Sequence, residues 1–322
     1  MLWFIAVLFL AALGASFVNQ VEVRSTIYLE EKTRAYFLAR EGLAQAEQEL
    51  SQQWADHRPW LGQADGTWRS TSNDQGQIRY KIRNEQGKLN LNRITAPVLN
   101  NALSMLGLAS DEAAQVGDAI LDWVDQDALR RANGAEADYY RRLDPSYQPP
   151  NGPIQNPGEL CFIRGINSSM LFGLGPEARE MGLEPGVGLW DIFTVYTRDR
   201  RVDVNSASYE VLMSLPEIDE DTVLRILEAR RRGPFMSLTD VRREIGDTRY
   251  RRLGPLLTVT PSRAYTIVSE GTVTQGRGHH VMMAVVRIMP AGRIERLFWV
   301  DDLFYTPPEH KAPVREDADI GR

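Results

Sequence analysis

Carboxylates gathered between residues 118 and 144 are the groups in this sequence best placed to do chemistry. Asp125 and Asp127 are separated by one residue, and Glu136 and Asp138 repeat that spacing just after Gly134. Hard oxygen ligands beside a glycine turn suit Ca²⁺, which takes roughly six to eight oxygens and tolerates irregular geometry. The D-x-D-x-D-G register of an EF-hand loop is absent, so a calcium site here would be of another kind.

The alternative for this stretch is a solvated acidic loop whose countercharges are Arg130, Arg131, Arg141 and Arg142. Zinc is disfavoured because the chain has only four His and a single Cys, Cys161. That single Cys also excludes an intrachain disulfide framework. No residue is marked as a nucleophile, so a calcium-dependent hydrolase is the weakest alternative and we expect no enzyme.

Predicted helices frame the acidic stretch on both sides. Val98 to Leu108 and Asp111 to Val124 carry apolar residues at helical spacing, and Pro157 to Ile163 predicts a short helix. Between them lies an acidic, Pro-rich excursion that ends near Pro153. Residues 173–188 hold five Gly and two Pro, which predicts a linker.

Two segments of this helical block share landmarks. The pattern K-L-N-L-N at 88–92 returns as R-V-D-V-N at 201–205, an offset of 113 residues. Gly-Pro-apolar at 152–154 returns at 233–235, an offset of 81 residues. Each unit predicts an extended Asn-containing segment, two helices, a Gly-Pro turn and a short helix. Two such units can bury together the faces that neither buries alone. The first carries about 32 extra residues, which hold the acidic stretch.

The second unit resembles the helix-hairpin-helix modules of DNA-binding proteins, in which a Gly-rich hairpin offers backbone N–H groups to phosphate. Here the hairpin, residues 215–221, has no Gly and four acids. Residues 198–263 hold thirteen Arg against eleven acids, and the whole chain has a net charge of −6 and a pI of about 5.4. These balances favour a protein interface, and we expect no nucleic-acid partner. A membrane-tethered DNA-binding protein is the alternative function.

Strand patterns flank the helical block. Alternating or β-rich runs occur at 77–84, 88–92, 265–274, 280–289 and 294–300. Trp54 to Gly76 lacks such a pattern and predicts an irregular loop. One small antiparallel sheet interrupted by a helical domain accounts for both β blocks, with one face covered by the N-terminal helix.

The N-terminus predicts one long helix. Leu2 to Val18 carries no charge and continues without a break into an amphipathic segment that ends near Gln53. The uncharged run predicts a membrane anchor slightly short of the roughly 20 residues of a full span. A cleaved signal peptide is the alternative, although residues 15–17 match a cleavage site poorly. In the amphipathic half, residues recurring every seven positions predict a partner-binding face: Leu29, Tyr36, Leu43 and Leu50.

Taken together, these motifs resemble the K-type minor pseudopilin of the type II (general) secretion system. The resemblance is carried by AYFLAREGLAQAEQEL (35–50), GKLNLN (87–92), AILDWVDQD (119–127), NGAEADYY (133–140), P-x-Y-x-P-x-N-G (145–152), the EL and IRGI of 159–166, and VDVNSAS (202–208). Beyond about residue 208 only the β-rich character agrees.

The resemblance implies a single-pass subunit of the bacterial inner membrane, in contact with its lipid and with its soluble body in the periplasm. It would sit at the tip of the pseudopilus, initiating and capping assembly with the I- and J-type minor pseudopilins for protein export across the outer membrane. It also implies Ca²⁺ in the inserted domain, with four candidate ligands: Asp125, Asp127, Glu136 and Asp138. Such subunits lack the usual acid of the lipid-facing segment, and here no acid precedes Glu22.

Pilin-class precursors carry a short basic leader that a prepilin peptidase removes. We attribute its absence before Met1 to a late-assigned start codon, and we expect that peptidase as a partner of a precursor with a leader.

We therefore predict an α+β fold in five parts. Residues 1–21 would cross the membrane, and 22–53 would continue as the amphipathic part of the same helix. Residues 54–92 and 259–305 would form a pilin-like antiparallel β domain. Residues 93–258 would form an inserted α-helical domain with two helix-hairpin-helix-like repeats, and 306–322 a disordered tail.

Overall fold

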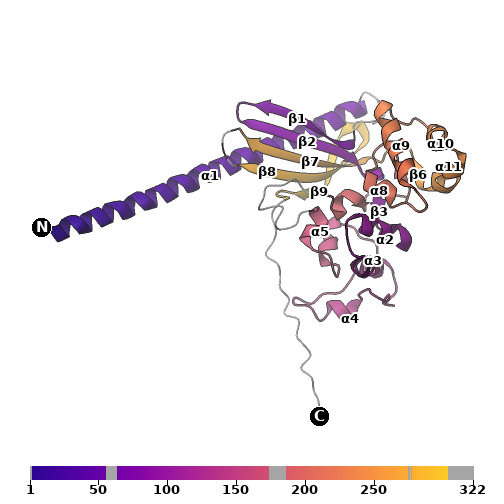
Figure 1. Ribbon diagram of the computed structural model, residues 1–322, viewed down its shortest axis with the longest axis horizontal. Coiled ribbons are helices and arrows are strands. Elements are labelled where there is room, and N and C mark those ends of the chain that lie inside the picture. The colour runs from indigo at the N-terminus through magenta and orange to yellow at the C-terminus, as the bar shows by residue number, and fades with distance from the viewer. Residues whose placement is uncertain (1, 56–63, 174–185, 275, 277, 304–322) are drawn as a thin grey trace, which may run out of the picture.

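A computed structural model describes residues 2–55, 64–173, 186–274, 276 and 278–303. Its longest element is α1 (Leu2–Ala55), one continuous helix that contains no Pro. The N-terminal part of α1 projects from the body, and its C-terminal part lies along a sheet (Figure 1). Glycine permits the close approach, because a Cβ on Gly42 would overlap Ser269 and Ile78 of the sheet, and one on Gly271 would overlap the α1 backbone.

The sheet has five antiparallel strands in the order β1-β2-β7-β8-β9. The strands are β1 (Asp65–Asn73), β2 (Gly76–Asn84), β7 (Ala264–Val273), β8 (His279–Ile288) and β9 (Ile294–Val300), with a short 3₁₀ turn, η4 (Pro290–Gly292), before β9. The predicted pairing of a segment near residue 80 with segments beyond residue 264 is confirmed, because β2 lies directly against β7.

The prediction of an irregular loop over 54–76 is wrong for residues 65–73, which form the edge strand β1. Its sequence is rich in Thr, Ser and Asn because one side of an edge strand faces water, so the apolar alternation is missing. The ring of Trp68 packs against cations of the neighbouring strand. Its centroid lies 4.7 Å from the guanidinium carbon of Arg79 and 4.9 Å from Nζ of Lys81.

The stripe predicted to bind partners is in part the protein's own core. Leu43 and Leu50 are 0% and 2% exposed and pack with Ile78, Ile82 and other side chains of the sheet. The prediction that they face a partner is therefore wrong. A seven-residue repeat marks one face of a helix but does not say whether another chain or the same chain covers it. Leu29, where α1 leaves the sheet, is 65% exposed.

The segment between β2 and β7 is mainly helical. Its elements are η1 (Glu85–Gly87), β3 (Leu89–Asn90), α2 (Ala96–Met105), α3 (Ser110–Val124), α4 (Ala137–Tyr140), η2 (Pro157–Phe162), α5 (Ser168–Phe172), α7 (Leu189–Ile192), β4 (Phe193–Thr194), β5 (Val202–Asp203), α8 (Tyr209–Met213), α9 (Glu220–Arg232), α10 (Leu238–Ile245), α11 (Asp247–Leu253), η3 (Gly254–Leu256) and β6 (Leu257–Thr258).

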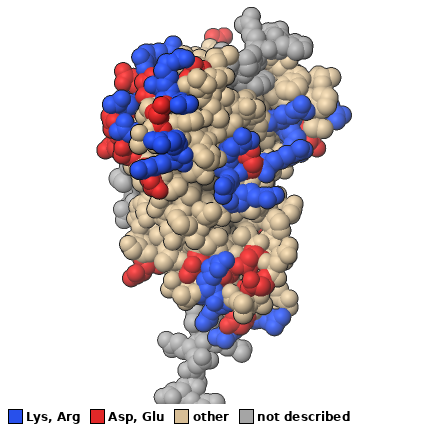
Figure 2. All heavy atoms as spheres, turned by 90° about the vertical axis from the view of Figure 1, so that its right-hand side faces the viewer, with Lys and Arg blue, Asp and Glu red and all other residues tan. Residues whose placement is uncertain are grey.

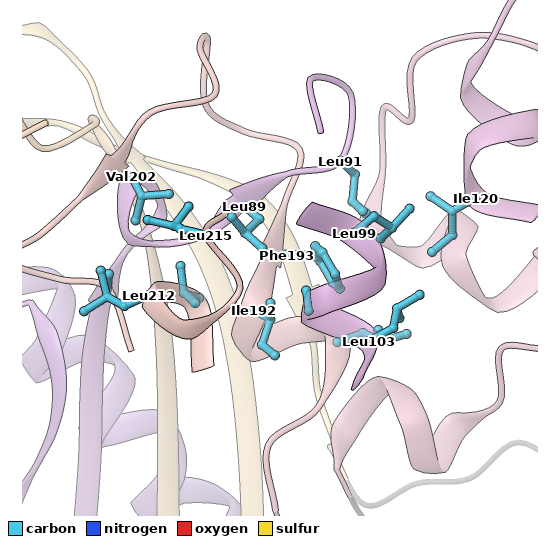
Figure 3. Close-up of a cluster of buried hydrophobic side chains, with 14 of the residues drawn as sticks. Leu89, Leu91, Leu99, Leu103, Ile120, Ile192, Phe193, Val202, Leu212 and Leu215 are labelled. Carbon is cyan, nitrogen blue, oxygen red and sulfur yellow. The ribbon is translucent and has the colours of Figure 1, made fainter. Parts of the chain in front are cut away.

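One apolar cluster holds this helical region together (Figure 3). Leu99 of α2 and Leu212 of α8 are both fully buried in it. Two short parallel strand pairs border the cluster, with Leu89 of β3 opposite Phe193 and Val202 of β5 opposite Leu257. Residues 88–92 were predicted to belong with the main sheet, which is wrong. The turn η1, capped by the side chain of Asn84, ends β2 and turns the chain away.

Two further predictions fall largely outside the described residues, namely the linker at 173–188 and the tail at 306–322. None of the helices in the described part of the chain combines the length and apolar character needed to cross a membrane.

Candidate metal centre

Three of the four predicted calcium ligands come together. One carboxylate oxygen from each of Asp125, Asp127 and Glu136 lies within 4.8 Å of the others. Asp125 is the residue at which α3 ends, and its extended backbone turns the chain out of the helix. Glu136 immediately precedes α4, and its backbone carbonyl accepts the first hydrogen bonds of that helix. The cluster therefore sits between the end of one helix and the start of the next.

A buried carboxylate fixes the loop that carries the cluster. Asp122, on the last turn of α3, is fully buried and accepts hydrogen bonds from the backbone N–H of Arg131 at 3.2 and 3.3 Å. The Arg131 guanidinium lies 3.1 Å from the second oxygen of Asp125. Gly134 packs so tightly on Asp122 that a Cβ there would overlap its carboxylate. Burial raises the pKa of Asp122 to about 6.

The cluster includes buried oxygens that have no hydrogen-bond donor. Oδ1 of Asp125 and Oε1 of Glu136 are buried without a hydrogen-bond partner, and so is Oδ1 of Asn151. Burial is the main cause that raises the pKa of both Asp125 and Glu136, and the negative charge of neighbouring carboxylates raises it further. A buried oxygen without a donor costs about 1–3 kcal/mol, so three of them in one place need a compensating partner. All are hard oxygen donors, which fits Ca²⁺ better than a softer metal.

Asn151 is a member of this group that the sequence did not single out. Its Nδ2 donates to the backbone carbonyl of Asp127 at 2.6 Å and to Oε2 of Glu136 at 3.3 Å. Its backbone is left-handed, with φ of 43°, a conformation that Asn tolerates better than most residues. The Asn-Gly of the 145–152 motif was the available signal, because Asn there combines a turn with an amide oxygen.

Asp138 does not join the cluster. Its side chain is 53% exposed, and it lies 3.8 Å from Arg130 and 3.9 Å from Arg142. Glu136 and Asp138 are two residues apart at the start of a helical turn, where successive side chains point in different directions. The spacing that looked equivalent to Asp125 and Asp127 therefore places Asp138 on the solvent side.

The hairpin that resembled a DNA-binding module offers no phosphate site. Asp219 caps α9, and its carboxylate accepts from the backbone N–H of Thr222 at 2.7 Å, where a phosphate oxygen would have to bind. Arg249 in turn pairs with Asp219 and Asp221. On the face formed by α9, α10 and α11, basic side chains are interspersed with acidic ones (Figure 2). The DNA-binding alternative is therefore unsupported.

Comparison with known proteins identifies the relatives of this chain. Residues 82–177 match the family described as type II secretion system (T2SS), protein K. The chain is 28% identical over 180 residues to the type II secretion system protein K of Aeromonas hydrophila, covering 49% of this chain and 54% of that protein. It is 24% identical over 231 residues to the protein K of Pseudomonas aeruginosa, covering 69% and 64%. With the protein K of Klebsiella pneumoniae it shares 31% identity over 160 residues, or 45% and 46% of the two chains.

The fold also matches a solved structure, the crystal structure of the GspK-GspI-GspJ complex from the enterotoxigenic Escherichia coli type 2 secretion system. The TM-score is 0.57 at 14% identity, and the match covers 87% of this chain and 98% of that chain. This similarity confirms the α+β fold with a long N-terminal helix and an antiparallel sheet. The chain spans about half to two thirds of the Aeromonas and Pseudomonas relatives. Taken together, these matches show that the chain is related to the type II secretion system K proteins, the family that its sequence resembles.

Proposed function

We propose that this protein is a minor pseudopilin at the tip of a type II secretion pseudopilus, where it initiates and caps assembly. The match of residues 82–177 to protein K carries this proposal. The similar fold found in a complex of GspK, GspI and GspJ supports I- and J-type subunits as partners. The proposal gives the protein a structural role and assigns no catalytic residue.

The outer face of α1 is the surface that this function needs. With Leu43 and Leu50 inside the core, the apolar side chains left for a partner are the exposed ones, such as Leu29 and Phe37, which are 65% and 57% exposed. Apolar side chains exposed along one helix are typical of a helix-docking surface.

Co-expression with I- and J-type subunits tests this surface. Leu29→Asp combined with Phe37→Asp should abolish co-purification, because each change places a charge in an apolar contact. Leu224→Asp is the control, since Leu224 is 51% exposed on α9, far from α1 along the chain. A double variant that still co-purifies at wild-type yield contradicts the proposed surface.

We also propose that the start of α1 anchors the protein in the inner membrane, with the body in the periplasm. Its apolar side chains support this, since Trp3, Phe4 and Phe9 are 79%, 66% and 65% exposed and need cover. Cell fractionation tests the anchor. The full chain should stay with membranes under alkaline wash and leave them in detergent, and release by the wash alone would contradict it.

We propose Ca²⁺ for the cluster of Asp125, Asp127 and Glu136, with Asn151 as a further oxygen donor. The ion would join the end of α3 to the start of α4 and stabilise the excursion. At free Ca²⁺ of about 100 times Kd, one site that binds only the folded state adds about 2.7 kcal/mol to the free energy of unfolding.

Thermal unfolding with CaCl₂ or EGTA tests this site. The melting temperature should rise with Ca²⁺, and the rise should disappear in Asp127→Asn with Glu136→Gln. Asp138→Asn is the matched control and should keep the rise, because Asp138 lies outside the cluster. The same rise in the first variant and in the wild type would exclude these ligands.

Finally, we propose that the inserted region, predicted as residues 93–258, is built on two helix-hairpin-helix-like units. We define the first unit as residues 88–160 and the second as residues 201–241. Matched hydrogen bonds support the equivalence. Asn92 donates to the carbonyl of Ile154 at 2.9 Å and accepts from its N–H at 2.8 Å. Asn205 does the same with Phe235, at 3.0 and 2.8 Å.

A further inference from the structure

A cleft of about 710 Å³ lies where the helical region meets the sheet. Its walls come from η1, the segment between β4 and β5, the residues before β7, and the end of β8 with the turn that follows. Among the described residues that line it are three Arg, namely Arg198, Arg263 and Arg287, and no Asp or Glu. This is unusual in a chain with 43 acidic and 37 basic residues, so the cleft is a positively charged site on an acidic protein.

The three guanidinium groups differ in how far they are already engaged. Arg263 lies over the ring of Trp54 at 5.1 Å, a contact that leaves its N–H groups free to donate. Arg287 lies 3.7 Å from Glu295, with both side chains more than 40% exposed, so water screens that pair. For Arg198, which is exposed, there is no ion pair within the described part of the chain. Each group can still donate to an incoming anion.

The other groups in the cleft offer little to a cationic ligand. The hydroxyl of Thr197 already accepts a hydrogen bond from the side-chain amide of Asn90. The N–H groups of Ile288 and Met289 donate to the carbonyls of Arg263 and Arg293 at the end of β8. The charged side chains among the described residues that line the cleft are all cationic, which selects a ligand that carries acceptors and negative charge.

The size and the remaining lining decide what kind of anion fits. The volume lies within the roughly 300–1,000 Å³ of typical ligand sites, far more than one inorganic anion fills. Apolar side chains that are at least partly exposed also line the wall, namely Met289 and two prolines, Pro261 and Pro290. A ligand with apolar groups between its carboxylates matches this mixture, and planar carboxylates match the fork of a guanidinium.

We propose that this cleft binds an acidic segment of another protein, one in which Asp or Glu alternate with apolar residues. Arg198, Arg263 and Arg287 would receive the carboxylates, and Met289, Pro261 and Pro290 the apolar side chains. The inference goes beyond the proposed tip function and uses neither the α1 surface nor the calcium cluster. Its outcome is therefore independent of theirs.

Fluorescence anisotropy with the full chain, purified in mild detergent, tests the cleft. The probe is a labelled synthetic peptide in which Glu alternates with Leu, compared with the same peptide carrying Gln in place of Glu. The Glu peptide should bind, and Arg198→Ala with Arg287→Ala should raise its Kd by about tenfold or more, since charge-assisted hydrogen bonds are lost. The Gln peptide should bind at least tenfold more weakly than the Glu peptide.

The matched control removes the same charge elsewhere. Arg225→Ala with Arg243→Ala alters two exposed Arg on α9 and α10, and it should change the Kd by less than about twofold because exposed charges at a distance are screened. Equal weakening by both double variants, or equal binding of both peptides, overturns the proposal. Displacement of the peptide by inorganic phosphate at equal concentration overturns it as well, since that would define a simple anion site.

Discussion

The first and second units proposed for the helical region have a matching Asn bridge but treat their acidic residues in opposite ways. In each unit one Asn side chain bridges back to the backbone of the residue after Gly-Pro. In the second unit the acids of the hairpin and of α10 are paired, as Asp219 is with Arg249 and Asp240 with Arg243. In the first unit Asp125 and Glu136 keep buried oxygens without a partner.

This difference shows which property of an acidic stretch distinguishes one unit from the other. Both units hold several Asp and Glu residues, so composition alone does not distinguish them. What separates them is desolvation without pairing, which costs free energy unless a ligand compensates it. The acids named in the second unit have Arg partners, whereas two carboxylates of the first keep buried oxygens without a hydrogen-bond partner.

The largest expected effect tests whether the two units form one core. Leu99→Ala in the first unit and Leu212→Ala in the second each remove a fully buried side chain, so each should lower the free energy of unfolding by about 2–5 kcal/mol. Because both belong to one apolar cluster, each variant should shift a single cooperative transition, measured by circular dichroism in urea.

The control for these variants is Leu129→Ala, because Leu129 is 78% exposed and its truncation should change stability by less than about 0.5 kcal/mol. Two separate transitions in Leu212→Ala, with only one of them shifted, would show that the units fold independently and would break the comparison.

The next effect tests the equivalence of the two Asn bridges. Asn205→Ala should lower stability by about 1–3 kcal/mol, because it leaves the buried N–H and carbonyl of Phe235 unsatisfied. Asn92→Ala should cost less, because Asn92 is only half-buried whereas Asn205 is 6% exposed.

Urea unfolding of both Asn variants measures this difference. Asn→Asp at each position keeps the acceptor but turns a charged oxygen towards the carbonyl of Phe235 or Ile154, so it should cost at least as much as the Ala variant. A cost for one Asn variant with none for the other would remove the argument that the bridges are equivalent.

Much of this architecture was predictable because it follows from periodicity and local chemistry. The repeat offset indicated that Asn92 and Asn205 are equivalent positions. The spacing of Asp125 and Asp127 indicated that both belong to the candidate centre. The sequence could not show that Asp138 faces solvent or that Asn151 closes the cluster, because both depend on how the excursion folds back over α3. Leu43 and Leu50 were misassigned for a related reason, since periodicity identifies an apolar face and tertiary packing decides what covers it.

The smallest expected effect concerns the first residues of two helices at comparable places in the two units. α9 is capped by Asp219, the residue before it, whose carboxylate accepts from the N–H and the hydroxyl of Thr222. α3 begins after Ala109, which makes no side-chain cap, although its backbone has the extended geometry that a capping residue needs. Glu112 already occupies the third helical position, so Ala109→Ser would supply the missing half of a capping box.

Ala109→Ser should therefore raise the free energy of unfolding by about 0.5–1 kcal/mol, while Asp219→Ala should lower it by a similar or slightly larger amount. Ala109 is exposed, so the change carries no packing cost that could mask the gain. Thermal unfolding in EGTA separates this effect from any stabilisation by Ca²⁺ at the other end of α3. If Ala109→Ser leaves the melting temperature unchanged while Asp219→Ala lowers it, the start of α3 is not a second capping site, and the two units differ at their helix starts as well as in their acids.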